Sequence, residues 1–369
     1  MRILYFSKNY STHDHRFLSA GIHGGHQMFY LRLEGNSRQM DDRPIPHQVE
    51  QIQWAGGREP FHWKKLPAYT LDIRRVIQKV KPDLIHAGPV QTCALIAALA
   101  GFHPLLTMSW GFDLMQDVQR NRCMKTATKF VMKRSAYFTS DAAVTRAVAI
   151  AFGMDPTRTS IVPWGVDLDV FKPVNRHTKV RTNCQILCNR SWEPRYGVDV
   201  LARAFGLAAA NRKDVGLILL GGGSQAQSIR TILSSSGVLD RVQFGGQVSQ
   251  KELPGWYREA DLFISPSHVD GTSVSLLEAL ASGLPVLVSD IPGNKEWISD
   301  GINGWLFQDG DPGALAEKMI TVLDQPERLV EVGRAGRRSV QERGDWVKNE
   351  ALLLKTYELA IQTVQNFRL

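Results

Sequence analysis

The sequence predicts an α/β protein of two doubly wound domains, each with a parallel sheet between helices. The 369 residues are too many for one ordinary domain and enough for two that each bury a core. Both halves alternate short β-branched runs with amphipathic helical patterns, which is typical of βαβ units. A turn-rich segment at 163–173 separates the two series.

Six strands are expected in each half. In the first half they are Arg2–Ser7, Gln27–Leu33, Leu84–Ala87, Leu105–Ser109, Tyr137–Ser140 and Thr159–Pro163. In the second half they are Cys184–Asn189, Val215–Leu220, Val242–Gly245, Leu262–Pro266, Val286–Ser289 and Gly304–Phe307. Helical periodicity is clearest in Tyr69–Val80, Gly197–Ala210, Gln225–Ser235, Val274–Ala281 and Pro312–Leu323.

We place the domain join in the turn-rich segment, which gives a first domain of residues 1–172 and a second of residues 173–345. A long helix is expected from Trp346 to about Val364, with no strand after it. We expect this C-terminal segment, 346–369, to pack back on the first domain and to couple the two.

Composition favours a globular protein that stays in the cytoplasm. Hydrophobic residues make up 43% and charged residues 22%. No apolar run reaches the roughly 18 residues that span a bilayer, and the start lacks the features of a signal peptide. The cysteines, which include no Cys-x-x-Cys pair, are interpreted as buried reduced thiols: Cys93, Cys123, Cys184 and Cys188.

The net charge of +8 lies entirely in the first half. Residues 1–175 hold 22 Lys and Arg against 14 Asp and Glu, whereas the remainder holds 22 of each. One stretch, 120–134, predicts a basic amphipathic helix with the cations Arg120, Arg122, Lys125, Lys129, Lys133 and Arg134 and the apolar positions Met124, Ala127, Phe130 and Val131. Two interpretations stay open: a helix lying on the anionic inner face of a membrane, or an ordinary solvated helix.

The stretch from Asp270 to Glu278 has the pattern of an anion-binding helix start. It follows an expected strand, and an apolar helical pattern begins near Val274 and ends at Gly283. The first amides of a helix lack intrahelical acceptors and lie at the positive end of its dipole, which suits a diphosphate. The residues expected to line this site are Gly271, Thr272, Ser273, Val274 and Ser275.

Charged side chains flank the same site. Asp270 and Glu278 are placed to accept hydrogen bonds from sugar or ribose hydroxyls, the alternative being that Glu278 is merely a solvated helix residue. Arg190 follows an expected strand, where its guanidinium can reach two phosphate oxygens at once.

The Asp-x7-Glu pattern, continued by EALASGLPVLVSDIPGNKEWI and GINGWLF, strongly resembles the Glu-x7-Glu signature of glycosyltransferase family 4. The resemblance implies a GT-B fold, in which two Rossmann-like domains face each other across a cleft and the second holds the donor nucleotide. It also implies that Asp270 contacts the transferred sugar and Glu278 the ribose. Because Asp270 replaces a glutamate, the donor sugar is not implied.

The family also has an arginine followed about five residues later by a lysine just before a glycine. Arg190 and Arg195 match in charge and spacing, but Tyr196 stands between Arg195 and Gly197, so a surface charge remains the alternative for Arg195. By the same resemblance, Gly222 lies close to the ligand and the backbone of Gln247 and Val248 contacts the base. A plain loop is the alternative for this last turn.

The first domain is expected to bind the acceptor. Its first loop carries His13 and His15, either of which is expected to orient an acceptor hydroxyl, although solvated loop histidines are the alternative. The later Gly24-Gly25-His26 run is interpreted as a structural turn. Trp110 replaces the family's usual histidine in a His-Gly-x-Asp pattern, so we expect Trp110 to stack on a sugar and Asp113 to bind a hydroxyl.

Two Asp-x-Asp triplets resemble metal sites but have structural explanations. Asp167-Leu-Asp169 lies in the turn between domains, and Asp311 precedes Pro312 as a helix N-cap would. Since arginines and helix amides already supply positive charge, we predict no essential metal and no cofactor.

The expected activity is transfer of a sugar, with retention, from a UDP- or GDP-linked donor to a hydroxyl acceptor such as a lipid-linked glycan or a cell-envelope polysaccharide. Retention is implied by the resemblance. The alternatives are a GT-B nucleotide-sugar epimerase and a non-catalytic nucleotide-sugar binding protein. A dinucleotide-dependent oxidoreductase is disfavoured because neither half has the full glycine fingerprint, and no nucleic-acid partner is expected.

Overall fold

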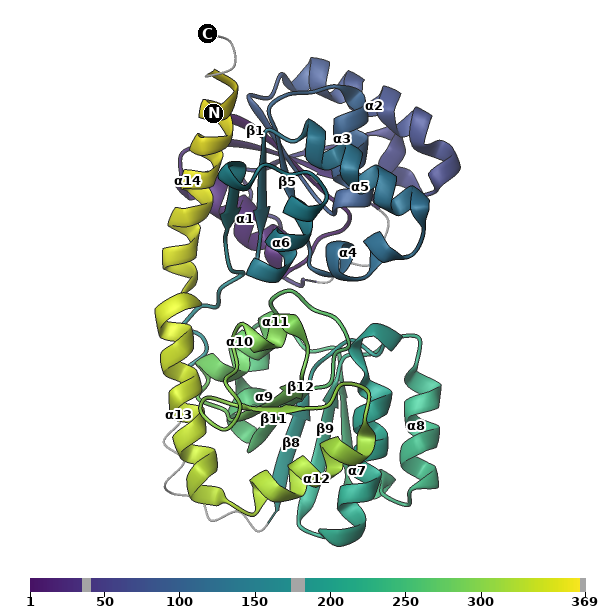
Figure 1. The fold of residues 1–369 in the computed structure, drawn as a ribbon, viewed down its shortest axis with the longest axis vertical. Coiled ribbons are helices and arrows are strands. Elements are labelled where there is room, and N and C mark those ends of the chain that lie inside the picture. Colours follow the sequence, from purple (N-terminus) through teal and green to yellow (C-terminus); the bar gives the residue numbers. More distant parts are fainter. Residues whose placement is uncertain (35–40, 174–182, 366–369) are drawn as a thin grey trace. The chain divides into compact units, whose positions relative to one another are not determined.

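The computed structural model describes residues 1–34, 41–173 and 183–365. Two compact units emerge (Figure 1): Met1–Trp164 together with the chain from Val347 onward, and Gly165–Trp346. Segment 165–172, which we assigned to the first domain, lies in the second unit because Val166 and Phe171 are buried in its core. The end of the expected C-terminal segment, 366–369, lies outside the described residues.

The first unit is a parallel sheet flanked by helices. In the part of the chain that the structure describes, its strands follow the order β3-β2-β1-β4-β5-β6-β7. They are β1 Arg2–Ser7, β2 Gln27–Arg32, β3 Glu50–Ile52, β4 Leu84–Ala87, β5 Leu105–Met108, β6 Tyr137–Ser140 and β7 Thr159–Ile161. The helices are α1 Thr12–His23, α2 Leu66–Val80, α3 Leu95–Ala100, α4 Phe112–Met115, α5 Arg122–Arg134, α6 Ala143–Ala151 and α14 Trp346–Gln365.

The second unit repeats this architecture. Its described strands follow the order β10-β9-β8-β11-β12-β13, and all their pairings are parallel. They are β8 Cys184–Cys188, β9 Val215–Leu220, β10 Val242–Gly246, β11 Leu262–Ser265, β12 Val286–Ser289 and β13 Trp305–Phe307. The helices are α7 Val198–Asn211, α8 Ala226–Ser235, α9 Leu253–Glu259, α10 Val274–Ala281, α11 Pro292–Lys295, α12 Pro312–Leu323 and α13 Pro326–Arg343.

Strands β9, β11 and β12 of the second sheet are buried along their whole length, which is why they read as continuous apolar runs. Along β9, Leu217 and Leu219 belong to the cluster beneath α7, α8 and α12. Ile218 and Leu220 point the other way, into the cluster beneath α9 and α10. This alternation follows from the two-residue period of a strand. Because all these strands are parallel, the loops that follow them emerge at one carboxyl edge, where the site is built.

The expected α/β fold class is confirmed, and one strand was missed. The expected strands are present, with ends that differ by at most two residues. The missed strand, β3, spans only Glu50–Ile52, and its first two residues are exposed. Pairing with Phe29–Leu31 of β2, rather than any local apolar pattern, makes it a strand.

Helix α14 packs within the first unit. Its Leu353, Tyr357 and Ala360 are fully buried, and the Tyr357 hydroxyl lies 3.1 Å from Nδ1 of His86 on β4. A Cβ on Gly24 would lie 2.5 Å from Leu354, so the glycine lets the helix approach closely. Gly25 has a φ of 71°, which agrees with the structural turn expected between α1 and β2.

Candidate donor site and acceptor side

The candidate donor site lies where the second sheet reverses its strand order. β8 and β11 are neighbours at the centre of that sheet, with β9 on one side and β12 on the other. Arg190 follows β8, and the loop that carries Asp270 follows β11. Ligands of open α/β sheets bind in the crevice at the carboxyl ends of such strands.

Helix α10 begins beside this crevice, with the bounds predicted from sequence. Ser273 is its N-cap, and the Ser273 hydroxyl accepts a hydrogen bond of 3.3 Å from the amide of Leu276. Thr272 and Ser273 are buried, and Gly293 lies so close to the preceding loop that a Cβ there would stand 2.2 Å from the Gly271 carbonyl oxygen. The helix start is therefore held rigidly.

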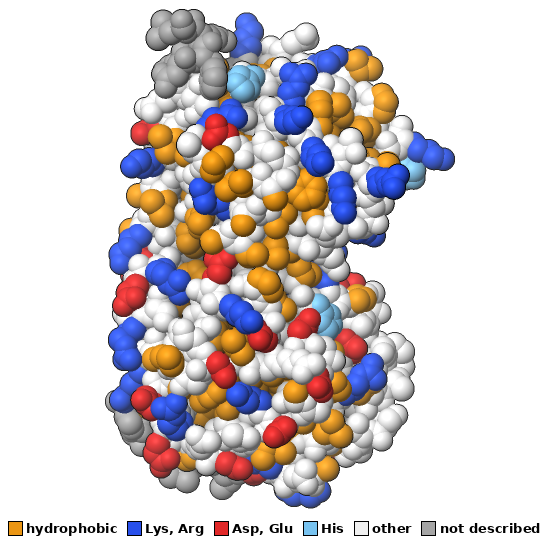
Figure 2. Space-filling model, in the orientation of Figure 1, with side chains coloured by type: hydrophobic (Ala, Val, Ile, Leu, Met, Phe, Trp, Pro, Cys, Tyr) orange, Lys and Arg blue, Asp and Glu red, His pale blue; other side chains and the backbone are white. Residues whose placement is uncertain are grey.

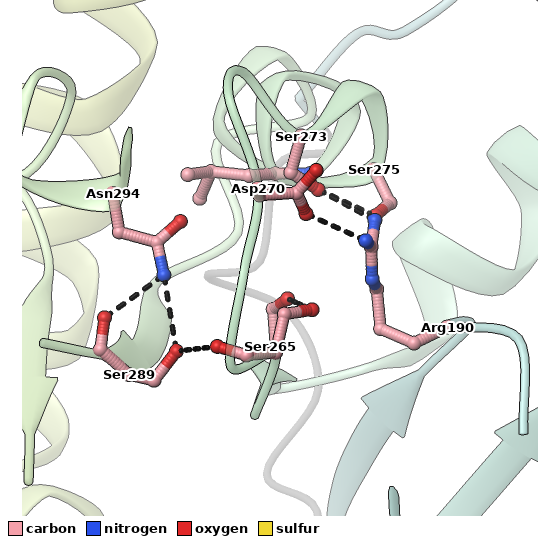
Figure 3. Close-up of polar contacts among 9 residues, drawn as sticks. Arg190, Ser265, Asp270, Ser273, Ser275, Ser289 and Asn294 are labelled. Atoms are coloured by element: carbon pink, nitrogen blue, oxygen red, sulfur yellow. Dashed lines mark hydrogen bonds and ion pairs between the residues drawn. The ribbon is translucent and has the colours of Figure 1, made fainter. Parts of the chain in front are cut away.

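A second network of hydrogen bonds holds the loop between β11 and α10. The Asn294 amide donates to the carbonyl and the hydroxyl oxygen of Ser289, at 2.9 and 3.3 Å (Figure 3). The Ser289 hydroxyl in turn donates to the Ser267 carbonyl, in the loop that leads to Asp270. Buried hydrogen bonds of this kind fix the path of a loop because breaking them leaves unpaired polar atoms.

Arg190 reaches across from β8 to the start of α10. Its Nη1 donates to the hydroxyls of Ser273 and Ser275 at 2.8 and 3.0 Å, and its Nη2 donates to Asp270 at 2.6 Å (Figure 3). The side chains of Arg190 and Asp270 are 12% and 17% exposed, so this ion pair is weakly screened by solvent. The predicted residues Arg190, Asp270, Ser273 and Ser275 thus form one cluster.

Burial and neighbouring charges have opposing effects on the pKa of each partner in the Arg190–Asp270 ion pair. Burial raises the pKa of Asp270, while the neighbouring Arg190 and Arg195 pull it down. Burial alone would lower the pKa of Arg190, but Asp270 and nearby groups outweigh it and raise the pKa. A diphosphate arriving here would compete with Asp270 for the guanidinium.

Glu278 is buried on the inner side of α10. It is 2% exposed, so the alternative of a solvated helix residue is wrong. Its Oε2 lies 3.0 Å from the hydroxyl of Tyr257 on α9, and that hydroxyl accepts a 2.8 Å hydrogen bond from Asn189 at the end of β8. Neither Tyr257 nor Asn189 was singled out from sequence, because a lone tyrosine in an amphipathic helix carries no local signal.

The turn after Arg190 holds Arg195 near the cluster. Residues Pro194–Tyr196 form a 3₁₀ turn, and the Arg195 carbonyl accepts a 3.0 Å hydrogen bond from the amide of His268. Arg195 is half-buried and partly offsets the burial that raises the pKa of Asp270. Hydrogen bonds from Ser224, and to a smaller extent Arg195, lower the pKa of Glu193. Tyr196, which interrupts the family's pattern, lies with its ring centroid 4.4 Å from the Arg190 guanidinium carbon.

The glycine-rich turn and the expected base-binding turn border the same edge. Gly222 is exposed, its carbonyl accepts from the amide of Trp192 at 3.0 Å, and a Cβ there would meet nothing within 4 Å. Gln247 is exposed and Val248 half-buried just after β10. The two turns are joined by a hydrogen bond from the Gly221 amide to the Gly246 carbonyl.

The Asp-x-Asp triplets have local roles. Asp311 is an N-cap whose Oδ1 accepts from Gly313 and Ala314, as predicted. Asp167 accepts from the amides of Asp169 and Val170 in a tight turn. Within the described ranges, no group of three or more His, Cys, Asp or Glu side chains is arranged to hold a metal ion.

On the acceptor side, the two histidines lie in the first turn of α1 rather than in a loop. The ring of His13 lies 4.0 Å from that of Trp164 and 6.2 Å from that of Trp110. Burial, helped by Arg16, lowers the pKa of His13 to about 3, so its imidazole is neutral. Nδ1 of His15 lies 2.8 Å from the Tyr10 hydroxyl, and burial lowers its pKa too. Neither is simply solvated.

Asp113 does not have the predicted role. It is fully buried, and its carboxylate accepts hydrogen bonds from the Ser109 hydroxyl and from the amides of Val90, Trp110 and Leu114 at 2.7 to 3.0 Å. These donors occupy the oxygens that an acceptor hydroxyl would need. Asp113 therefore shapes the loop that carries Trp110, and only half-buried Trp110 remains a candidate contact.

The predicted basic helix is α5, Arg122–Arg134, capped by the Asn121 side chain. Its buried side holds Thr128, Val131 and Met132, while its Lys and Arg side chains are exposed. Lys and Arg side chains gather over the region where Figure 1 places α2 and α5 (Figure 2). Among the described residues, no helix is both long and apolar enough to cross a bilayer.

Comparison with known proteins gives consistent matches over both units. The sequence model described as glycosyl transferases group 1 matches residues 174–339, and the one described as glycosyl transferase 4-like matches residues 2–142. A GDP-mannose-dependent monoacylated alpha-(1-6)-phosphatidylinositol monomannoside mannosyltransferase of Corynebacterium glutamicum is 30% identical, over 70% of this chain and 71% of its own length. A GDP-mannose-dependent alpha-(1-6)-phosphatidylinositol monomannoside mannosyltransferase of Mycobacterium tuberculosis is 28% identical, over 76% of this chain and 77% of its own length.

Solved structures show the same fold. Sucrose-phosphate synthase from Thermosynechococcus elongatus superposes with a TM-score of 0.81 at 18% identity, covering 97% of this chain and 98% of its own. Anabaena Alr3699/HepE in complex with UDP and glucose gives 0.79 at 17% identity, covering 97% and 99%.

Proposed function

The chain belongs to the family of glycosyl transferases group 1 and is a nucleotide-sugar glycosyltransferase of GT-B fold; we propose that it transfers a sugar with retention to a hydroxyl acceptor, without an essential metal. The observation that carries this proposal is the cluster of Arg190, Asp270, Ser273 and Ser275 at the start of α10. It combines a multidentate cation with helix amides at the carboxyl edge of a sheet.

In this proposal the donor diphosphate binds between the guanidinium of Arg190 and the first turn of α10, Gly271–Ser275. Asp270 then leaves its pair with Arg190 to accept a hydrogen bond from the sugar. Glu278, held by Tyr257, contacts the ribose, and the turns at Gly222 and at Gln247 and Val248 border the nucleotide. The relatives' names support GDP as a donor nucleotide, and the UDP complex of a similar fold supports UDP.

The proposed chemistry needs a stabilised leaving group rather than a nucleophile in the protein. The C1–O bond to the diphosphate breaks while the acceptor oxygen bonds to C1 on the same face. The leaving phosphate takes the acceptor proton, so no separate base is required. Arg190 and Arg195 stabilise the negative charge that develops on the leaving diphosphate, which removes the need for a divalent cation.

The acceptor is proposed to bind the first unit near His13, His15 and Trp110. A neutral imidazole such as that of His13 can donate a hydrogen bond to a hydroxyl or accept one from it. The indole of Trp110 offers a flat apolar face to a sugar. A lipid-linked acceptor is supported by the relatives' names and by the basic face of α5, which suits an anionic membrane surface.

A binding screen followed by turnover tests the proposal. Thermal shifts are measured with UDP, GDP and ADP and with their sugars; a ligand at a hundred times its Kd stabilises by about 2.7 kcal/mol. The selected donor is then incubated with and without acceptor, in the presence of EDTA, and products are analysed by NMR. We expect acceptor-dependent release of nucleoside diphosphate and an unchanged anomeric configuration. An isomerised donor would indicate an epimerase, and binding without turnover a non-catalytic protein.

A further inference from the structure

The guanidinium of Arg190 contacts three kinds of group: an aromatic ring, two hydroxyls and a carboxylate. Its face lies over the ring of Tyr196, at 4.4 Å from the centroid. One terminal nitrogen meets the hydroxyls of Ser273 and Ser275, and the other meets Asp270. Its Nε is buried and has no hydrogen-bond partner among the described residues. We propose that Tyr196 is a positioning residue that holds Arg190 for the donor diphosphate, an inference that rests on the proposed function.

The backbone gives Tyr196 little freedom to move away. The 3₁₀ turn that ends at Tyr196 is closed by a 2.8 Å hydrogen bond from its amide to the Glu193 carbonyl. The next residue, Gly197, has a φ of 60°, and a Cβ there would lie 2.1 Å from the Pro266 carbonyl oxygen. The amide of His268 donates to the Arg195 carbonyl at 3.0 Å. The backbone on both sides of Tyr196 is therefore held against the loop that leads to Asp270.

An aromatic ring positions a cation in a way that a carboxylate does not. The π face attracts the guanidinium and excludes water from one side, yet it adds no negative charge to cancel the positive one. Burial raises the pKa of the Tyr196 hydroxyl, so the ring remains neutral at physiological pH. Arg190 thus keeps its full charge for a diphosphate while losing rotamer freedom before the ligand arrives, which reduces the entropic cost of binding.

This role explains the interruption of the family pattern seen in the sequence. Where the family has a lysine directly before the glycine, this chain has Tyr196 before Gly197. A tyrosine cannot contact a phosphate as a cation. Its ring instead acts through Arg190, for whose guanidinium the diphosphate competes with Asp270.

Calorimetric titration of the full chain tests this inference with two kinds of ligand, nucleoside diphosphates and nucleosides. UDP and GDP report binding through the diphosphate, whereas uridine and guanosine report the nucleoside part alone. We expect Tyr196→Leu to weaken binding of the nucleoside diphosphate about tenfold and to leave nucleoside binding unchanged. Tyr196→Phe, which keeps the ring, should stay within about twofold of the wild type. Phe130→Leu removes the ring beneath Arg134 in the first unit and serves as the matched control.

Three results would overturn the inference: equal loss of diphosphate and nucleoside affinity in Tyr196→Leu, equal loss in Tyr196→Phe, or no more loss than in Phe130→Leu. Its failure is distinguishable from failure of the proposed function. If wild-type protein binds none of the nucleoside diphosphates, the donor site itself is wrong. If it binds one of them and Tyr196→Leu binds it equally well, only the role of Tyr196 is wrong.

Discussion

Arg190 is a single side chain that touches a ring, two hydroxyls and a carboxylate, so its substitutions separate charge from geometry. We expect Arg190→Ala to lower kcat/KM about 10² to 10³-fold, because one positioned donor to developing charge contributes roughly that much. Arg190→Lys keeps the charge but cannot span both serines and the phosphate, so its activity should lie between. Release of nucleoside diphosphate measures the rate.

The matched control is Arg203→Ala, which removes a half-exposed arginine paired with Asp199 on α7 of the same unit. Its rate should equal that of the wild type. If Arg190→Ala were as active as Arg203→Ala, the assignment of the diphosphate site would be contradicted.

A second residue gives a prediction on pH. His86 is fully buried, and burial lowers its pKa to about 3, against 6.5 as the ordinary value. The unfolded chain therefore binds a proton below pH 6.5 that the folded chain does not, and the free energy of unfolding must fall as the pH drops through this window. For one such group the loss between pH 7.5 and pH 5 is about 2 kcal/mol.

Denaturant unfolding at both pH values checks this linkage with His86→Phe, which cannot titrate. The variant loses the contact with Tyr357 and is expected to be less stable at pH 7.5, yet its stability should fall less on acidification. His13, also shifted to about 3, contributes equally to both proteins and cancels. An identical pH dependence in the two proteins would show that His86 is not the cause.

Local sequence patterns identify which residues belong to the donor site, but not which atoms their side chains contact. Arg190, Asp270 and Ser273 follow from local pattern, and they do meet. The prediction that Asp113 binds an acceptor hydroxyl was wrong, because its carboxylate accepts a hydrogen bond from the amide of Val90, a partner that no local pattern indicates. Tyr257 was missed because its contact with Glu278 joins two helices whose packing is set by the sheet.

At the scale of elements, two glycines in neighbouring turns have opposite predicted consequences. Gly197 adopts a φ of 60° against the Pro266 carbonyl, so Gly197→Ala should lower the free energy of unfolding by at least about 2 kcal/mol. Gly222→Ala places its methyl group in open space and should change stability by less than about 0.5 kcal/mol. Because Gly222 borders the proposed nucleotide, its variant should instead weaken donor binding.

Chemical denaturation and calorimetric titration measure both effects on the same preparations. If Gly222→Ala binds the nucleoside diphosphate as tightly as the wild type, the glycine-rich turn does not approach the ligand. Equal stability of the two variants would contradict the close contact at Gly197.

Elements were predictable where a local pattern sufficed. Helices α10 and α12 have the predicted bounds; Asp311 caps α12 as expected, and Ser273, predicted only to line the site, caps α10. Strand β3 was not predictable, since three residues with two exposed polar side chains become a strand only by pairing with β2. The join between the units was misplaced because Val166 and Phe171, turn residues by sequence, are buried in the second core.

For the whole molecule, the asymmetry of charge between the two halves carries the membrane proposal. Each exposed lysine near an anionic membrane surface contributes roughly 1 kcal/mol to the free energy of membrane binding. We therefore expect the variant Lys125→Gln with Lys129→Gln to bind phosphatidylserine-containing vesicles about thirtyfold more weakly than the wild type. Co-sedimentation at low ionic strength measures this.

The control is Lys213→Gln with Lys251→Gln, which removes two exposed lysines from the second unit. It should bind vesicles like the wild type. Equal loss in the two double variants would indicate unspecific attraction by net charge, and no vesicle binding by the wild type would remove the membrane part of the proposal.

The central claim is that Arg190 and the start of α10 bind a diphosphate. It is tested most directly by a crystal structure with the nucleoside diphosphate that gives the largest thermal shift. We predict that the β-phosphate lies within hydrogen-bonding distance of the Arg190 guanidinium and of the first amides of α10, with Asp270 released from its pair. A diphosphate bound elsewhere, with the Arg190–Asp270 pair intact, would contradict it.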